Sequence, residues 1–247
     1  MLRFVLLPFL LSCCPTLALS APFDWSAFDQ FLKSHVVQGN YQGIEANLVD
    51  YPALVNDQSF LQIADSLNRY NPTPLSANEK LAFYINAYNY FAIKIVVDNW
   101  PVKKSIKDIG SLLRPVWKKT VGHINGEPVT LDEIEHAILR PMGEPRIHFA
   151  IVCASMSCPD LRTEVYNAEQ LDAQLANQVS VFLANNTKGA IIKKDTLYLS
   201  EIFDWFGEDF AKSGGVIAFV SHYQPRLGNF KDFETIDYNW QLNRIRQ

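Results

Sequence analysis

Apolar and polar positions follow two periods along the chain, and together they predict a mixture of helices and strands. Apolar residues at helical spacing predict amphipathic helices over residues 24–37 and about 58–69. A capping box that begins at Ser76 starts a longer helix, which runs to about Asn99. Its middle, residues 81–97, is apolar nearly all round, so we expect a central buried helix.

The second half of the chain predicts short strands and short helices. Asn125–Gly126 is a strong turn signal between segments 116–124 and 127–130, and a second hairpin is expected around Lys194–Asp195. Residues 147–153 are apolar without alternation, which predicts a strand covered on both faces. Further helices are expected over 131–139, 167–185, 200–205 and 216–223, and a last strand over 235–240. This order favours an α+β fold, in which a mostly antiparallel sheet packs against the long buried helix and several shorter helices.

The first twenty residues have the pattern of a secretory signal peptide. Arg3 precedes an apolar run over 4–11, and small residues stand before Ala21. We therefore expect cleavage near Ala21, a single domain over residues 21–247, and export to the periplasm or the medium. A lipoprotein anchor at Cys13 is the alternative. No later run is long and apolar enough to span a bilayer.

Composition and charge restrict the classes of function. The formal net charge is −4, and 48% of the residues are hydrophobic, which suits a globular domain with a sizeable core. Scattered basic residues give no electrostatic case for nucleic acid. The chain has no P-loop, no dinucleotide fingerprint, no G-x-S-x-G and no H-E-x-x-H, and we expect no cofactor.

Cys153 and Cys158 are the only cysteines after the leader, and they flank a polar turn that contains Ser157. In an oxidising compartment they can form a disulfide, with Cα atoms ~4.4–6.8 Å apart and a stabilisation of ~2 kcal/mol. Alternatively, Cys158 is a reactive nucleophile, or both are plain buried thiols. A zinc site is the weaker interpretation, because the spacing is not that of a zinc knuckle.

Two histidines are candidates for chemistry. His136 is expected on a short helix, four residues after Asp132 and four before Arg140, so that the aspartate can orient the imidazole. The alternative is a solvated helix face with local ion pairs. His148 lies in the apolar run, where a core role competes with a catalytic role.

Asn86 and Asn89 lie three residues apart on the buried helix. Buried amides need partners, so these side chains either bind the backbone of a neighbouring loop or line a pocket and donate to a substrate carbonyl. We expect Asn86, His136, His148 and Cys158 to converge on one polar cleft, because proteins break local patterning mostly at functional sites.

Several ordered motifs resemble those of the family called domain of unknown function 547. They are Tyr84–Asn89, Leu131–Arg140, Arg146–Pro159, Ile202–Phe210 and Tyr238–Asn243, and the resemblance covers about residues 40–245. It favours a site role for His136, and the matched motifs supply Arg140, Arg146 and Ser157 as candidate binding residues. The family name carries no reaction.

Two classes of function therefore stay open. The first is an exported module with a structural disulfide that binds a small molecule or a protein partner. The second is a thiol-dependent hydrolase or acyl-transfer enzyme, with Cys158 as nucleophile and His136 or His148 as base. The buried helix packed on an antiparallel sheet resembles the papain and transglutaminase-like arrangement. That arrangement places the nucleophilic cysteine at the start of the central helix, whereas the matching helix here holds Asn86 and Asn89 and no cysteine. The sequence favours the binding module.

Overall fold

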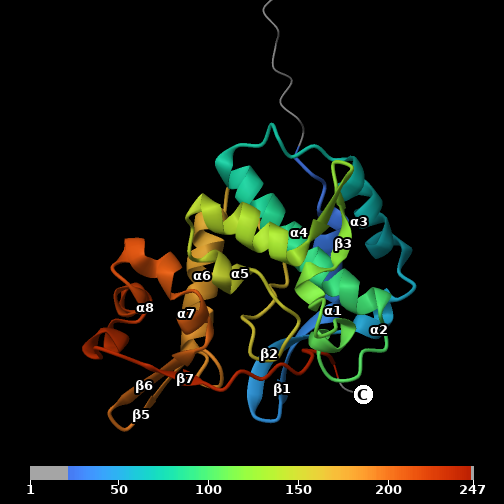
Figure 1. Cartoon of the computed structure of the whole chain (residues 1–247). Helices are drawn as coiled ribbons and strands as arrows, with labels where there is room; N and C mark the ends of the chain where they lie inside the picture. Colours follow the sequence, from blue (N-terminus) through green and yellow to red (C-terminus); the bar gives the residue numbers. More distant parts are fainter. Residues whose placement is uncertain (1–21, 246–247) are drawn as a thin grey trace, which may run out of the picture.

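The computed structural model describes residues 22–245, and the expected leader over residues 1–20 lies outside the described residues (Figure 1). Within this range the chain is α+β, as predicted: helices dominate, and the strands form small sheets. None of the helices over 22–245 is long and apolar enough to cross a membrane.

Helix α4, Ala77–Asp98, is the central element of the larger apolar core. The side chain of Ser76 accepts from the Glu79 backbone, and the Glu79 carboxylate accepts from Ser76 in return, so the predicted capping box is present. Because its surface is apolar nearly all round, the helix is buried along most of its length. The preceding helices are α1, Ser26–His35; α2, Tyr51–Leu54; and α3, Gln58–Arg69.

The strands form three small sheets rather than one. The first is the antiparallel hairpin of β1, Val36–Tyr41, and β2, Ile44–Val49; the second is that of β3, Thr120–Ile124, and β4, Glu127–Thr130. The third joins β5, Ala190–Lys193, and β6, Thr196–Ser200, antiparallel, and adds β7, Glu234–Ile236, parallel to β6. The turn residues Asn125, Gly126 and Lys194 have the positive φ that tight hairpins require. No strand was predicted over residues 36–49, and the helix expected to reach Val37 ends at His35.

The strand expected over residues 147–153 is wrong. Residues Ile147–Ala150 form the short helix α5, and an extended loop follows. The Asn89 side chain on α4 forms two hydrogen bonds with the backbone here. Its Nδ2 donates to the Ala150 carbonyl at 2.9 Å, and its Oδ1 accepts from the Val152 N–H at 2.8 Å. An apolar run that is buried on all sides has no period by which a short helix and a strand can be told apart.

The remaining helices contribute to both core clusters. The α-helices are α6, Leu171–Ala184; α7, Ile202–Trp205; and α8, Val216–Tyr223. The 3₁₀ helices are η1, Ile106–Ile109; η2, Val116–Lys118; η4, Arg140–Met142; η5, Gly207–Ser213; and η6, Pro225–Asn229. The segment Glu133–Leu139, η3, is a π-helix, and it follows the second predicted capping box between Thr130 and Glu133.

Chain segments that are far apart in sequence meet beside the cysteines. Figure 1 shows α6 to α8 and the β5–β7 sheet on one side of the molecule, and α1 to α3 on the other. After β7 the chain crosses between these sides and reaches β2, where the Val49 N–H donates to the Asn243 carbonyl. On the way, the Met156 N–H donates to the Gln241 carbonyl, so the C-terminal segment lies against the cysteine loop.

Candidate functional site

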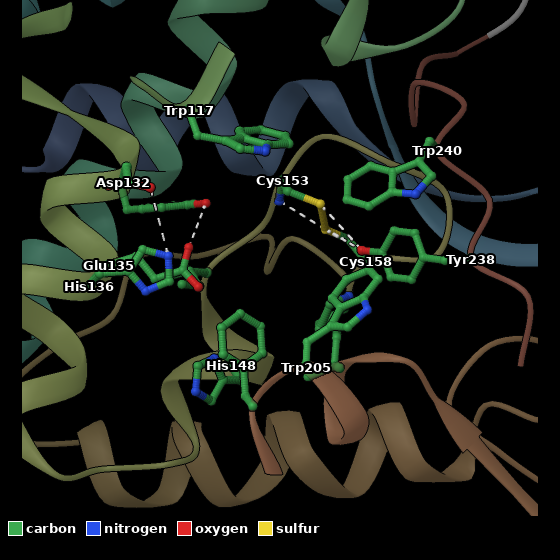
Figure 2. Close-up of a pocket in the computed structure, with 15 residues that line it drawn as sticks. Trp117, Asp132, Glu135, His136, His148, Cys153, Cys158, Trp205, Tyr238 and Trp240 are labelled. Carbon is green, nitrogen blue, oxygen red and sulfur yellow. Dashed lines mark hydrogen bonds and ion pairs between the residues drawn. A yellow bond between two sulfur atoms is a disulfide. The ribbon is translucent and has the colours of Figure 1, made fainter. Parts of the chain in front are cut away.

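A pocket of about 180 Å³ lies where η3, the cysteine loop, α7 and the C-terminal segment meet (Figure 2). Four of the predicted site residues line it: His136, His148, Cys153 and Cys158. Three walls surround the space, and each has a distinct chemistry: a disulfide, a carboxylate–histidine group and a cluster of aromatic rings.

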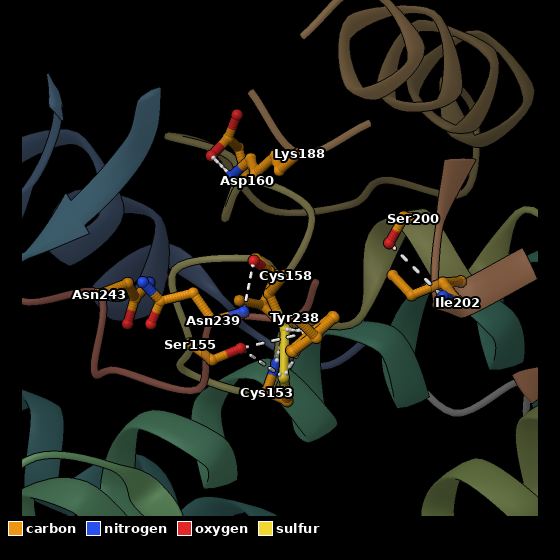
Figure 3. The surroundings of a disulfide bond; sticks show 12 residues. Cys153, Ser155, Cys158, Asp160, Lys188, Ser200, Ile202, Tyr238, Asn239 and Asn243 are labelled. Carbon is orange, nitrogen blue, oxygen red and sulfur yellow. Dashed lines mark hydrogen bonds and ion pairs between the residues drawn. A yellow bond between two sulfur atoms is a disulfide. The ribbon is translucent and has the colours of Figure 1, made fainter. Parts of the chain in front are cut away.

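Cys153 and Cys158 form the predicted disulfide, with Cα atoms 6.2 Å apart (Figure 3). Cys158 is buried at 3% exposure, whereas Cys153 is partly exposed. The Cys158 Sγ accepts from the Cys153 backbone N–H at 2.9 Å and from the Tyr238 hydroxyl at 3.2 Å. The Tyr238 hydroxyl also lies 3.3 Å from the Cys153 Sγ and 3.3 Å from the Ser155 Oγ. Hydrogen-bond donors are therefore already directed at the sulfur atoms.

The second wall comes from η3. Burial raises the pKa of Glu135 to about 7, against the opposing effect of the Tyr88 hydroxyl, which donates to its Oε2 at 3.3 Å. The His136 Nε2 lies 3.9 Å from the Asp132 carboxylate, so the predicted aspartate–histidine pair is present. The His136 Nδ1 lies 3.2 Å from the Arg140 guanidinium. Both ring nitrogens of His136 therefore face other side chains of its own helix region.

His148 lies below this wall in Figure 2, and its buried ring belongs to a charge network that is partly exposed. Its Nε2 is 2.7 Å from the Asp209 carboxylate, which also accepts two hydrogen bonds from Arg140, at 2.7 and 2.9 Å. Hydrogen bonding to Arg140 lowers the pKa of Asp209, and burial lowers that of His148 to about 4, although Asp209 opposes this shift. At neutral pH the neutral ring must then donate from Nε2 to the ionised carboxylate. The ring of His148 stacks on Phe206, with centroids 4.0 Å apart.

The aromatic wall joins three elements. Trp205 of α7 packs on Tyr238 and Trp240, with ring centroids 4.8 and 5.7 Å away. Trp117 of η2 reaches Trp240 from the other side at 6.2 Å. The Lys107 Nζ lies 3.3 Å from the centroid of the Trp240 ring, so this wall already holds one cation–π contact.

Five predicted residues do not line the pocket. Asn86 forms hydrogen bonds with the backbone of Tyr166 through both polar atoms of its amide, and Asn89 does the same with the segment before Cys153. Both amides therefore bind the backbone of a neighbouring loop, which was one of the two alternatives. Arg146 pairs with Glu144 at 2.6 Å and Asp172 at 2.9 Å in a separate surface cluster. Ser157 accepts from the Asn239 N–H, and Arg140 acts through Asp209 and His136. The expected convergence thus holds for His136, His148 and Cys158 and fails for Asn86.

Comparison with known proteins gives a family. Residues 72–183 match the family model described as protein of unknown function, DUF547. The segment 72–183 is therefore similar to the DUF547 family, in agreement with the motifs that suggested it. Searches of curated proteins and of solved structures gave no match. The disulfide wall and the carboxylate wall both lie within the matched residues 72–183. Four aromatic residues of the pocket follow this range in sequence: Trp205, Phe206, Tyr238 and Trp240.

Sequence reasoning missed several residues that line the pocket. Tyr88 and Glu135 stand next to predicted residues in the matched motifs, and their proximity in sequence was the available signal. Trp205 and Tyr238 also line the pocket, and they lie in the C-terminal motifs. Asp209 lies in one of these motifs too and contacts the pocket residue His148. No group of three or more His, Cys, Asp or Glu residues within the part of the chain that the structure describes is arranged as metal ligands.

Proposed function

We propose that this protein is a binding module whose pocket receives a small ligand with an apolar body and a cationic end. The supporting observation is the charge of the lining: Asp132 and Glu135 contribute carboxylates, and no Lys or Arg within residues 22–245 lines the pocket. Aromatic faces beside carboxylates attract cations through the ring quadrupole and the negative charge together. The small volume suits a small molecule rather than a polymer segment.

Glu135 is the residue whose ionisation would govern this binding. Its pKa of about 7 results mainly from burial, and the charged groups around it are Asp132, Asp209 and Arg140, besides the Tyr88 hydroxyl. A cation that enters the pocket favours the ionised carboxylate, so binding should strengthen as the pH rises from 6 to 8.

The test is a fluorescence titration, because three tryptophans line the pocket. Benzyltrimethylammonium should quench the emission at lower concentration than benzyl alcohol, its neutral counterpart. Glu135→Gln should weaken the binding of the cation about tenfold, since a charged contact contributes ~1.5 kcal/mol or more. The variant should also lose the increase of affinity with pH. Glu127→Gln, on exposed strand β4, is the matched control. Equal binding of the two probes, or an unchanged Glu135→Gln variant, would refute the proposal.

A thiol-dependent hydrolase or acyl-transfer enzyme is the second candidate, because His136 lines the same pocket as the cysteine pair. It requires a reduced Cys158 and a histidine that activates it. On this candidate, His136→Ala abolishes the labelling of reduced Cys158 by iodoacetamide and its pH dependence. The contacts of His136 with Asp132 and Arg140 favour the opposite result, in which labelling of Cys158 is unchanged.

The disulfide also supports the proposal that the protein is exported, because such bonds persist in oxidising compartments. N-terminal sequencing of the protein recovered outside the cytoplasm should then begin near Ala21. A mass that includes residues 1–20, or a lipid-modified Cys13, would contradict simple cleavage by signal peptidase.

A further inference from the structure

The two sulfur atoms of the disulfide have different surroundings. Cys153 is partly exposed at the pocket wall, and Cys158 is buried. The Cys158 Sγ receives the Cys153 backbone N–H, a donor that cannot turn away while the loop keeps its conformation. The Tyr238 hydroxyl, held in the aromatic wall, lies within hydrogen-bond distance of both sulfur atoms (Figure 3). The Cys153 Sγ also lies 3.1 Å from the Ser155 Oγ, but that hydroxyl donates to the Tyr238 oxygen. Cys153 is thus the more accessible residue, and Cys158 is the one whose sulfur receives a fixed backbone N–H.

We propose that the Cys153–Cys158 disulfide is a thiol–disulfide exchange site for small thiols that enter the pocket, an activity beyond ligand binding. The thiolate of the small thiol attacks the Cys153 Sγ and forms a mixed disulfide with it. The Cys153–Cys158 bond breaks, and its electron pair passes to the Cys158 Sγ, which leaves as a thiolate. The Cys153 N–H and the Tyr238 hydroxyl stabilise that negative charge as it develops.

A second molecule of the small thiol completes the exchange. Its thiolate attacks the small-molecule sulfur of the mixed disulfide and releases Cys153. Two thiols are thereby oxidised to one small disulfide, and the two cysteines take up the two electrons and the two protons. The same steps in reverse oxidise the protein with a small disulfide, so the co-reactant is of one chemical class in both directions.

The pocket also selects among small thiols by charge. Asp132 and Glu135 line it, and no Lys or Arg of the described part of the chain does, so a thiol with an ammonium group is favoured over a thiol with a carboxylate. With rates normalised to the thiolate concentration, cysteamine should react faster than 2-mercaptoethanol, and 2-mercaptoethanol faster than 3-mercaptopropionate. Glu135→Gln should reduce the differences in rate among the three thiols, and Glu127→Gln should leave these differences unchanged.

The decisive experiment locates the first adduct. The folded full-length protein is exposed briefly to 2-mercaptoethanol, quenched with iodoacetamide and mapped by peptide mass spectrometry. We expect the mixed disulfide on Cys153 and the alkyl group on Cys158. An adduct mainly on Cys158, or no reaction before the chain unfolds in urea, would overturn the proposal.

A matched pair of variants tests the role of the tyrosine hydroxyl. Tyr238→Phe should slow the reaction about tenfold, the factor that corresponds to ~1.4 kcal/mol and to the lower range of a hydrogen bond to a charged group. Tyr166→Phe removes a buried hydroxyl that touches neither sulfur, and its rate should stay that of the wild type. Equal rates in the two variants would refute the stabilising role of Tyr238.

If Tyr238→Phe does not fold, the position of the first adduct in the wild type still decides the proposal. Loss of cation binding with exchange intact would refute the proposed function alone.

Discussion

Asn89 should be among the most sensitive positions of the chain. Its side chain is 3% exposed and satisfies two backbone groups, the Ala150 carbonyl and the Val152 N–H. Asn89→Ala leaves both groups buried without partners, and each such group costs ~1–3 kcal/mol. The expected loss is therefore about 2–6 kcal/mol, a large part of the 5–15 kcal/mol by which a typical domain is stable.

Asn86→Ala provides the matched comparison, because Asn86 lies on the same helix and bonds one carbonyl and one N–H of Tyr166. Urea denaturation should show similar losses of stability for the two variants. Their effects on the pocket should differ, because only Asn89 holds the segment that leads to Cys153. In folded protein, cysteine exchange should change in Asn89→Ala and stay unaltered in Asn86→Ala. A loss below about 1 kcal/mol for Asn89→Ala, or equal effects on exchange, would contradict this reasoning.

Three further predictions concern buried polar groups. Lys188→Met should destabilise the fold by about 3 kcal/mol in urea denaturation, because it leaves the Asp160 carboxylate without its 2.7 Å partner; adding Asp160→Asn should recover most of the loss. The stability of the wild type relative to that of His148→Gln should fall by roughly 3 kcal/mol between pH 6.5 and pH 4, because His148 has a folded pKa of about 4 and the unfolded chain binds the proton first. Glu135, whose folded pKa is raised, titrates in both proteins with the opposite sign, so a difference between the two proteins that does not change with pH would contradict the assignment. Tyr166→Phe should keep or raise the urea midpoint, since the buried hydroxyl has no hydrogen-bond partner among the described residues, and a marked loss would reveal one.

Local signals in the sequence were sufficient to predict elements whose start or turn is determined by neighbouring residues. The capping box at Ser76 starts α4, and the turns at Asn125–Gly126 and Lys194–Asp195 form the hairpins that were expected. These signals work because the side chain and the backbone group that it bonds are a few residues apart. The hairpin of β1 and β2 was missed, although Gly43 and the alternation after it, through Ala46 and Leu48, were available signals.

Long-range contacts explain the elements that local signals could not predict. The apolar run at 147–153 is a short helix and a loop because the side chain of Asn89, some sixty positions earlier, bonds its backbone. The π-helical form of η3 likewise follows no feature that was read in the sequence, which predicted an ordinary helix there. The position of Tyr238 against the sulfurs depends on the path of the chain after β7, and no local pattern encodes that path.

Helix α4 contacts two of the pocket walls through hydrogen bonds. Tyr88 donates to Glu135 in the carboxylate wall, and its neighbour Asn89 holds the loop of the disulfide wall. Two consecutive residues on a buried helix therefore hydrogen-bond to groups in both walls. The Tyr238 hydroxyl adds the aromatic wall to the same group of contacts, because it reaches both sulfur atoms. Reduction of the disulfide would leave this hydroxyl with two separate thiols, so the redox state of the cysteines and the shape of the ligand pocket should depend on each other.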